Sequence, residues 1–355
     1  MLNKEFIEDV MYGRKSSRVL GALLFFLSLV YGVLVRLRTG VYAAGLFRTK
    51  RLPCRVISVG NITLGGTGKT PTVINIAGLM QQRGRRPLVL SRGYGRKDES
   101  ETAVVSDGAS LVLDPSVGGD EPALIANRLA RVPVVVGSDR YHAGTFAIGR
   151  FHPDCIVLDD GFQHIRLARD LNIALIDASD PFGKGMLFPA GTLREPISAL
   201  ERADVVVITR VDQAGDVASL KETIRKHTAA RIFSARYTPR DLVDAASGET
   251  RPLSTLNGAA VFAFAGIARP ASLASLLGSL GAVVKGTAWY ADHHPYTKSD
   301  IARVFQGAVD SRATIAVTTE KDSIRLKGMA PEGVWALRID LEVLEKASWE
   351  EVLLG

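Results

Sequence analysis

The sequence GNITLGGTGKTP, residues 60–71, decides the fold of this chain. It follows RVISV at residues 55–59, a β-branched run that is typical of a buried strand. The next segment, residues 72–84, has apolar residues at helical spacing and ends at Gly84, a common helix stop. A strand, a glycine-rich turn and a helix that begins near Lys-Thr together predict a phosphate-binding loop.

The residue types of this loop suit phosphate chemistry. Glycines let backbone N–H groups converge on phosphate oxygens, and the helix N-terminus adds a positive partial charge. Lys69 would reach the β- and γ-phosphates, and the Thr70 hydroxyl would ligate Mg²⁺. Thr63 stands where the usual pattern has glycine, and a glycine-rich turn with an incidental lysine is the alternative interpretation. The predicted nucleotide-binding residues of the loop are Asn61, Thr63, Leu64, Gly65, Gly66, Thr67, Gly68, Lys69 and Thr70.

Positive charge is concentrated at the N-terminus of this 355-residue chain, whose composition is that of a globular protein. The formal net charge is +7, and residues 1–51 contribute nine Lys or Arg against three Asp or Glu, a net of +6. The remainder carries only +1, which argues against a nucleic-acid-binding face and for a basic N-terminal arm. Cys54 and Cys155 have no metal-ligand spacing, so we expect reduced thiols.

Residues 19–35, VLGALLFFLSLVYGVLV, form an apolar stretch without a charge. As a helix they would span roughly 25 Å, slightly less than a hydrocarbon core of about 30 Å. Both flanks are basic, so the positive-inside rule does not choose an orientation. A secretory signal would export the phosphate loop away from cytosolic nucleotide. We therefore favour a helix that lies in an anionic membrane surface, with a spanning helix and a buried core helix as alternatives.

After the loop, apolar strand-like runs alternate with helical segments. This alternation predicts an α/β fold with a mostly parallel sheet and helices on both faces, as in phosphate-loop (P-loop) NTPases. The predicted organisation is a basic arm at 1–50 that carries the membrane-associated helix 19–35, a P-loop domain at 51–230, a connecting β ribbon at 231–256 and a smaller C-terminal α/β domain at 257–355.

Two carboxylates, Asp159 and Asp160, follow the apolar run at residues 155–158. An acid at a strand end beside a phosphate loop is the Walker-B arrangement, in which it holds Mg²⁺ directly or through water. Aspartate also often begins a loop after a strand, so the two carboxylates indicate a metal site only in combination with the phosphate loop. We expect at least one of the two to serve Mg²⁺.

Two further motifs allow both a functional and a structural interpretation. Asp120, in GDEP at residues 119–122, is either a helix N-cap or a base that takes the proton of a substrate hydroxyl. His293 and His294 follow Asp292 and could form a metal site, a base cluster or a solvated loop.

TRVD at 209–212 and TEKD at 319–322 each follow an apolar strand and are similar to the guanine-reading [NT]KxD element of GTPases. The first has arginine in place of lysine, and the second has its lysine one position late. Neither is a clean match, so they only motivate an alternative function.

In order, the motifs GNITLGGTGKTP, SRGYGR (91–96), GDEP, DDGFQH (159–164), PAGTLREP (189–196), DHHPY (292–296) and TEKD closely resemble those of the tetraacyldisaccharide 4′-kinase family, the lipid A 4′-kinases. The resemblance extends from the N-terminal apolar helix to about residue 326 and includes the threonine at the first loop position. It implies phosphorylation of the 4′-hydroxyl of a tetraacylated glucosamine disaccharide 1-phosphate. It also implies Mg·ATP as the phosphoryl donor and attachment, peripheral or monotopic, to the cytoplasmic face of the bacterial inner membrane.

The resemblance also implies roles for single residues. Asp120 matches the catalytic aspartate, which works with the histidine that His293 matches, and His294 is then incidental. Asp159, Asp160 and Gln163 match the paired carboxylates and glutamine expected near Mg²⁺. Arg194 and Glu195 match an Arg-Glu pair that we expect to contact nucleotide or phosphate. The expected partners are the lipid substrate and an anionic membrane surface, with no nucleic acid and no obligate protein partner.

Two other classes of function remain as alternatives. A membrane-recruited GTPase or ATPase switch that acts on a protein partner would explain the TRVD and TEKD motifs. A non-catalytic lipid-binding protein with a vestigial phosphate loop is the second, and the intact Lys69-Thr70 and Asp159-Asp160 pairs argue against it.

Overall fold

Strand β1 (Arg55–Asn61) lies at the centre of the larger domain, because it pairs in parallel with both β5 (Cys155–Asp159) and β6 (Leu171–Asp177). The computed structural model describes residues 4–12, 15–93, 96, 101–326, 328–329 and 332–355. Tyr94 and Gly95 of the SRGYGR motif lie outside the described residues.

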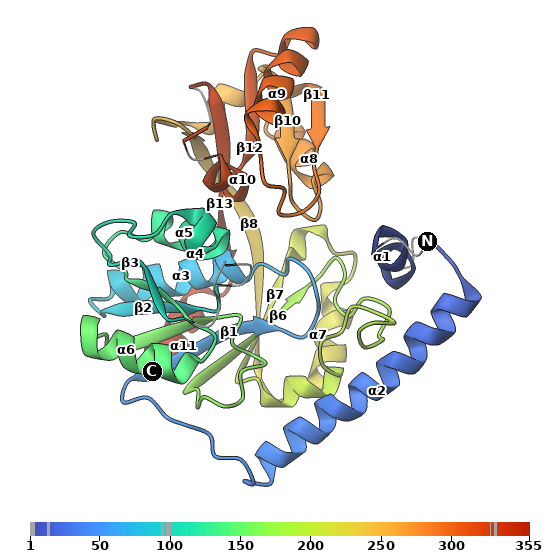
Figure 1. The fold of residues 1–355 in the computed structure, drawn as a ribbon, viewed down its shortest axis with the longest axis vertical. Helices are drawn as coiled ribbons and strands as arrows, with labels where there is room; N and C mark the ends of the chain where they lie inside the picture. The colour runs from blue at the N-terminus through green and yellow to red at the C-terminus, as the bar shows by residue number, and fades with distance from the viewer. Residues whose placement is uncertain (1–3, 13–14, 94–95, 97–100, 327, 330–331) are drawn as a thin grey trace.

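The described strands join into one sheet that runs through the whole molecule (Figure 1). Around β1 the pairing is parallel, except for the antiparallel edge strand β3. The order is β11-β10-β12-β13-β8-β7-β6-β1-β5-β2-β4-β3, with β9 (Thr250–Arg251) beside β8. The other strands are β2 Pro87–Ser91, β3 Ala103–Ser106, β4 Val134–Val136, β7 Val205–Thr209, β8 Arg231–Asp244, β10 Ala260–Ala265, β11 Val283–Trp289, β12 Ile315–Thr319 and β13 Val334–Val343.

Helices cover both faces of this sheet, which confirms the predicted fold class. Apolar side chains of α3 (Lys69–Gln82), α5 (Asp120–Arg128) and α11 (Lys346–Leu354) share one core on one face. The opposite face is covered by α6 (Arg140–Phe151), the 3₁₀ helix η1 (Ile197–Arg202) and α7 (Val217–Arg225). Short helical turns complete the domain: α4 (Pro115–Gly118) and η2 (Val211–Gln213).

The smaller unit stands above the larger domain in Figure 1 and is a three-layer α/β structure of its own. Its parallel strands are β10 (Ala260–Ala265), β11 (Val283–Trp289) and β12 (Ile315–Thr319). Its helices are α8 (Ala271–Ser279), α9 (Lys298–Asp310) and α10 (Glu320–Arg325), preceded by the 3₁₀ helix η3 (Leu253–Leu256). The cores that include α8 and α9 are separate, so these helices lie on opposite faces of the strands.

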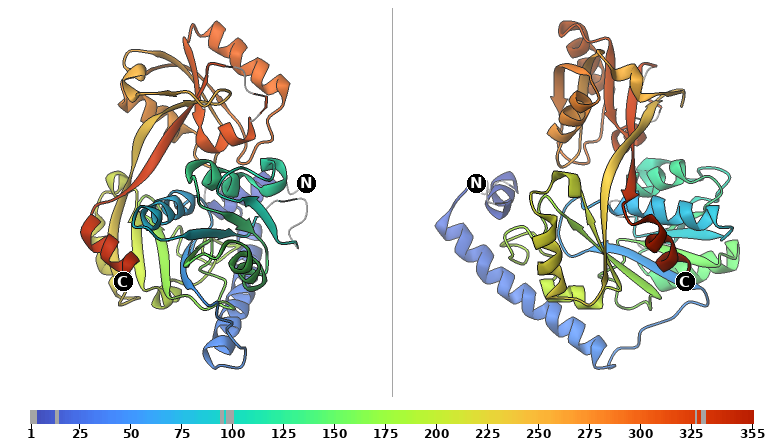
Figure 2. Two further views of the ribbon diagram at one scale, coloured as in Figure 1. Left: turned by 90° about the vertical axis from the view of Figure 1, so that its left-hand side faces the viewer. Right: turned by 180° about the vertical axis from the view of Figure 1, so that it is seen from behind.

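Two long strands connect the units. β8 runs up from the larger domain, and β13 (Val334–Val343) returns antiparallel to it (Figures 1 and 2). The chain then re-enters the larger domain, where Trp349 of α11 packs edge-on against Phe233 with ring centroids 5.3 Å apart. We therefore propose to count residues 341–354 with the P-loop domain rather than with the predicted C-terminal domain, because their apolar side chains lie in its core.

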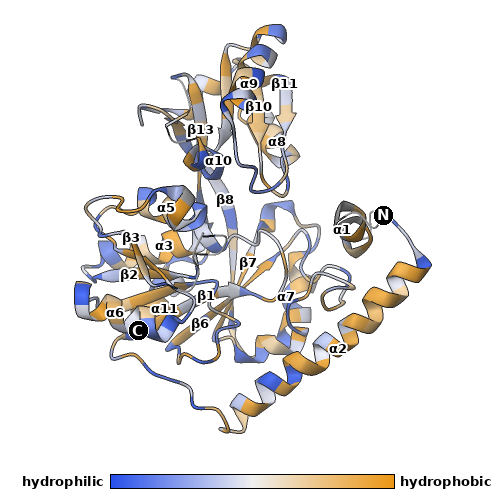
Figure 3. Ribbon diagram, in the orientation of Figure 1, coloured by the Kyte–Doolittle hydropathy of each residue, from blue (hydrophilic) through white to orange (hydrophobic). Residues whose placement is uncertain are grey.

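The N-terminal arm contains α1 (Lys4–Tyr12) and the long helix α2 (Arg18–Ala43). α2 exceeds the predicted 19–35 because Ser17 caps its start and arginine, a good helix former, continues it. It is the one helix in the described part of the chain that is long and apolar enough to cross a membrane. Its buried residues, Leu20, Leu24, Ser28 and Gly32, form a single stripe, and 22% of its apolar window is buried, so it is no core helix. Figure 3 shows that hydrophobic residues extend along most of its length.

Candidate active site

The phosphate loop connects β1 to α3, with Lys69 as the first residue of the helix. Gly65 and Gly68 have φ of 108° and 93°, a region that side chains disfavour. A Cβ at Gly68 would lie 1.8 Å from the hydroxyl of Tyr237, which comes from the ribbon strand β8. The turn therefore requires glycine for its backbone and for the close approach of Tyr237.

Hydrogen bonds from neighbouring segments hold the loop in this shape. The Asn61 side-chain amide donates to the Thr67 hydroxyl over 2.8 Å. The Thr209 hydroxyl donates to the Thr67 carbonyl over 3.0 Å, and Arg210 donates to the Gly66 carbonyl over 3.1 Å. The Arg210 guanidinium also lies 5.1 Å from the Tyr237 ring centroid. The first two residues of TRVD thus support the loop, a role that the sequence did not reveal.

The unusual threonine of the loop has a structural explanation. Thr63 forms an antiparallel bridge with Leu193, and the amide of the next residue, Leu64, donates to the Thr192 carbonyl over 2.6 Å. A β-branched residue suits this extended pairing better than glycine. The pairing fixes the position of the neighbouring Arg194.

Cations surround one of the two predicted carboxylates. Lys69 Nζ lies 3.7 Å from Asp160 Oδ1 and 3.5 Å from Asn61 Oδ1. Arg194 Nη1 lies 3.0 and 2.9 Å from the two carboxylate oxygens of Asp160. Burial raises the pKa of Asp160, but the charges of Lys69 and Arg194 outweigh burial and hold it below its ordinary value. The structure therefore gathers Lys69 and Arg194 at the loop, and their contacts with nucleotide stay a prediction.

The pKa of the adjacent carboxylate is shifted in the opposite direction. Asp159 is buried at the end of β5 and accepts a hydrogen bond of 2.9 Å from the Ser91 hydroxyl. Burial, followed by the charges of Glu121 and Asp160, raises its pKa to about 7. Its other oxygen, Oδ1, is buried without a hydrogen-bond partner. An unpaired carboxylate oxygen of this kind is a suitable ligand for a divalent cation.

The donor set therefore fits Mg²⁺ carried by a nucleotide. No group of three or more His, Cys, Asp or Glu side chains that could hold a metal ion occurs among the described residues. Mg²⁺ usually keeps water and phosphate ligands and takes only one or two carboxylates from the protein. Asp159 and Thr70, with Asp160 nearby, match that mode.

A third cation at this edge escaped sequence analysis. Arg140, at the start of α6, is 3% exposed and donates to the carbonyls of Gly137 and Asp159 over 2.7 and 3.4 Å. Burial lowers the pKa of Arg140 to about 10, so it stays charged at neutral pH. No motif signal marked it, because it follows a helix cap, Asp139, rather than a strand end.

Two predicted residues have partners that differ from the expected ones. Gln163 donates through its side-chain amide to the Asn61 carbonyl over 2.8 Å, so it braces β1, and its role near Mg²⁺ stays a prediction. Glu195 is buried and forms a 2.5 Å ion pair with Arg202 of η1. Its contact with nucleotide likewise stays a prediction.

Asp120 begins α5, but its side chain does not cap that helix. The N-cap position belongs to Gly119, which has no side chain to cap with. Asp120 Oδ2 instead accepts a hydrogen bond of 2.6 Å from Arg325 Nε and lies 3.4 Å from His293 Nδ1. Burial raises the pKa of Asp120, but the hydrogen bonds and charges of His293 and Arg325 outweigh it and lower this pKa. The structure thus brings Asp120 and His293 together across the two units.

The contacts of the second histidine are local. His294 stacks on Tyr290 with ring centroids 4.6 Å apart, and its Nε2 lies 3.2 Å from Asp300 Oδ2. Asp300 is the residue that completes the capping box of α9 with Thr297. His294 therefore supports the start of a helix.

Comparison with known proteins identifies the family. A model of the family described as tetraacyldisaccharide-1-P 4′-kinase matches residues 20–355. The tetraacyldisaccharide 4′-kinase of Syntrophus aciditrophicus is 44% identical over 352 residues, 96% of this chain and 94% of that relative. The enzyme of the same name from Geobacter metallireducens is 44% identical over 309 residues, 87% of this chain and 89% of the relative. The crystal structure of LpxK from Aquifex aeolicus in complex with ATP matches with a TM-score of 0.78 and 33% identity, covering 94% of this chain and 98% of that one.

The chain belongs to the tetraacyldisaccharide-1-P 4′-kinase family.

Membership makes the chain an ATP-dependent kinase of lipid A biosynthesis. It excludes the alternatives of a nucleotide switch and of a non-catalytic lipid-binding protein as the function of this fold. The TRVD and TEKD motifs are accordingly no guanine readers in this kinase: Thr209 and Arg210 support the phosphate loop, and Arg325, next to TEKD, contacts Asp120.

The opposite pKa shifts of Asp159 and Asp160 predict opposite effects of pH on the stability of the kinase. Between about pH 4 and pH 7 folded Asp159 retains a proton that the unfolded chain releases, so its effect on the free energy of unfolding becomes less favourable as pH rises, by up to about 4 kcal/mol. An asparagine side chain at this position cannot ionise. We therefore expect Asp159→Asn to raise the melting temperature at pH 8 more than at pH 5, measured with chelator and without nucleotide.

Asp160→Asn is the matched variant. The lowered pKa of Asp160 means that its carboxylate stabilises the fold above the unfolded pKa and loses this effect as pH falls through the folded pKa. Asp160→Asn should therefore lower the melting temperature at pH 8. An equal response of both variants to pH would contradict the assignment.

Proposed function

We propose that the protein transfers the γ-phosphoryl group of Mg·ATP to the 4′-hydroxyl of a tetraacylated glucosamine disaccharide 1-phosphate at the cytoplasmic face of the inner membrane. The observation that carries this proposal is the juxtaposition of two halves of a site. Lys69, Arg194 and Asp159 gather at the phosphate loop, and the Asp120–His293 pair lies between the two units. The reaction is inferred from family membership, and the candidate role of each residue is inferred from its position in the site.

Catalysis of phosphoryl transfer consists mainly of positioning and charge neutralisation. The loop amides and the N-terminus of α3 would hold the phosphates, while Lys69 and Arg194 would offset the charge on the transferring group. Both cations already share Asp160, so they can exchange a carboxylate for a phosphate oxygen. Mg²⁺, when bound with ATP, would supply further charge neutralisation at the phosphates, and Asp159 and Thr70 would hold it.

Asp120 is the candidate base for the acceptor hydroxyl. Its lowered pKa keeps it ionised at neutral pH. Both described contacts of its carboxylate are made by Oδ2, so Oδ1 has no hydrogen-bond partner among the described residues. Oδ1 would accept the hydroxyl proton, which leaves the acceptor oxygen as that oxygen forms its bond to phosphorus.

Attachment to the membrane surface is supported by the packing of α2. Tyr31 donates to the Arg194 carbonyl over 2.8 Å, and Arg38 donates to the Gln163 carbonyl over 2.9 Å. Contacts from Leu20 to Arg38 thus hold one side of α2 against the catalytic domain, which favours a helix that lies in the interface over one surrounded by lipid. Its other side exposes large apolar side chains: Val19, Leu23, Phe25, Phe26, Leu27, Leu29, Val30, Val33, Leu34 and Leu37.

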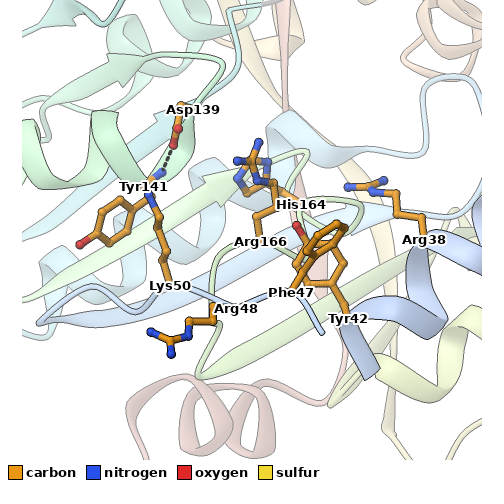
Figure 4. A pocket seen from close by; sticks show the side chains of 9 residues that line it. All are labelled: Arg38, Tyr42, Phe47, Arg48, Lys50, Asp139, Tyr141, His164 and Arg166. Atoms are coloured by element: carbon orange, nitrogen blue, oxygen red, sulfur yellow. Dashed lines mark hydrogen bonds between the residues drawn. The ribbon is translucent and has the colours of Figure 1, made fainter. Parts of the chain in front are cut away.

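A basic pocket of about 460 Å³ lies at the C-terminal end of α2, beside His164 of the DDGFQH motif (Figure 4). Burial lowers the pKa of His164 to about 4, so the positive charge of the pocket comes from four other side chains. One acid, Asp139, also lines it, but its carboxylate caps α6. A phosphate of the anionic lipid suits this charge. The four cations are Arg38, Arg48, Lys50 and Arg166.

The direct test is incubation with γ-labelled ATP and a disaccharide 1-phosphate lipid, followed by chromatography of the lipid. We expect label on the acceptor. Lys69→Ala should lower turnover by roughly 10³-fold, because it removes a charge that stabilises the transferring phosphoryl group. Label that appears only as inorganic phosphate would contradict the proposed acceptor, and near-normal turnover of Lys69→Ala would place the nucleotide elsewhere.

A double-mutant cycle tests the base. Asp120→Asn should lower kcat by roughly 10²–10⁴-fold, the usual worth of a positioned base, with little change in the KM for ATP. If His293 acts with Asp120, adding His293→Ala should cost less than the product of the single effects. Asp216→Asn is the matched control, because Asp216 caps α7 and asparagine caps equally well. A fully active Asp120→Asn would overturn the base assignment.

A third experiment tests the membrane contact without touching the packed side of α2. Phe26 and Val30 are 62% and 45% exposed, and changing both to Asp should move the kinase towards the soluble fraction and raise the KM for micellar lipid. Val309→Asp is the control, because Val309 is 69% exposed on α9 of the smaller unit. Unchanged membrane association of the double variant would contradict this role of α2.

A further inference from the structure

Helix α10 places two cations beside the Asp120–His293 pair. Lys321 and Arg325 are one helical turn apart and lie on the same side of α10. Arg325 contacts Asp120, and Lys321 contacts His293. Family membership alone assigns neither residue a role in the reaction.

The contact of Lys321 decides which nitrogen of His293 carries the proton. Lys321 Nζ lies 3.0 Å from His293 Nε2. The carboxylates of Glu121 and Asp292 lie 3.3 and 4.0 Å from the same Nζ, which favours the charged ammonium form. An ammonium group can only donate hydrogen bonds, so Nε2 must accept and carries no proton. In neutral His293 the proton is then on Nδ1, the nitrogen that faces Asp120 Oδ2.

Arg325 fixes the same carboxylate oxygen from the other side. Its Nε donates to Asp120 Oδ2 over 2.6 Å, while its Nη1 donates to the Gly266 carbonyl over 2.9 Å and to Asp322 Oδ1 over 3.0 Å. The Arg325 side chain is only 5% exposed, so its position is well determined by packing. Oδ2 is therefore occupied, whereas Oδ1 has no hydrogen-bond partner in the described part of the chain and is left for a further partner.

The TEKD motif builds this arrangement. Asp322 is fully buried and accepts hydrogen bonds from Thr319, Tyr296 and the Gly266 amide over 2.6, 3.1 and 3.1 Å. These bonds fix the start of α10 relative to the loop after β10. The His293 backbone, with φ of 60°, donates to the Gly266 carbonyl, so the same loop also holds the histidine. A left-handed conformation at a non-glycine residue is retained where surrounding contacts enforce it.

We propose that Lys321 and Arg325 are positioning residues: Lys321 locks His293 in the tautomer with the proton on Nδ1, and Arg325 holds Asp120 Oδ2, so that Oδ1 receives the acceptor hydroxyl. The inference rests on the proposed function of Asp120. It assigns a role in the kinase reaction to Lys321, the lysine of TEKD. Glu121 of GDEP supports that role, because its carboxylate lies beside the Lys321 ammonium group.

The test is the ring ¹⁵N spectrum of the full-length kinase in detergent micelles, with labelled histidine and assignment by His293→Gln. At pH 8 we expect the Nδ1–H pattern for His293. Lys321→Met should convert it to the Nε2–H pattern, and Lys321→Arg, which keeps a donor, should preserve it. Lys298→Met is the matched control, because Lys298 is an exposed lysine of the same unit.

Kinetics complete the test. Lys321→Met should lower kcat by roughly 10–100-fold with less than about a twofold change in the KM for ATP, as expected for a residue that orients a catalytic group. An Nε2–H pattern in the unaltered kinase would overturn the proposal, and this measurement requires no variant to fold. A changed tautomer with unchanged kcat would also overturn it. A fully active Asp120→Asn with the predicted tautomer change would instead refute the base and leave the lock intact.

Discussion

The attraction between a phosphate group and the turn from β1 to α3 is the constraint on which the rest of the site depends. Open backbone amides and a helix N-terminus require anions, and the chain supplies one of its own, Asp160, to the cations that gather there. Thr209 and Arg210, at the end of β7, hold the turn through hydrogen bonds, and Tyr237 of the ribbon strand β8 lies close against it. Contacts within the protein itself thus hold the turn in its shape.

The geometry of a strand end explains why two neighbouring carboxylates differ so much. Successive side chains of a strand point to opposite sides. Asp159 still belongs to β5 and is enclosed with Ser91, whereas Asp160 has left the sheet with φ of 50° and meets Lys69 and Arg194. A shift of one residue along the chain is therefore enough to reverse the direction of the pKa shift of the carboxylate.

Local signals in the sequence predicted the parts of the site that depend on local geometry. The loop, the strand ends and the helix after the loop are short patterns, and parallel strands bring their carboxyl ends to one edge. The contacts of Lys321 with Glu121 and of Arg325 with Asp120 could not be predicted in this way, because they join residues about 200 positions apart through the docking of two units. TRVD and TEKD were similar to guanine readers, since a polar turn after a buried strand looks alike whether it binds a base or braces a loop. The packing of α11 against the larger domain could not be predicted either, because the apolar side chains of a helix do not by themselves indicate which sheet they cover.

The return of the chain into the larger domain affects the order in which the protein folds during synthesis. Trp349 and Leu353 complete the core that begins at Ile57, so that core stays incomplete until residues 349–353 have been synthesised. The core of the smaller unit, whose last members in the chain are Trp335 and Leu337 of β13, is complete earlier. Domains generally form as they emerge from the N-terminal end. Here the smaller unit can form first, and the core of the larger domain, with its nucleotide loop, is completed only when α11 packs onto it.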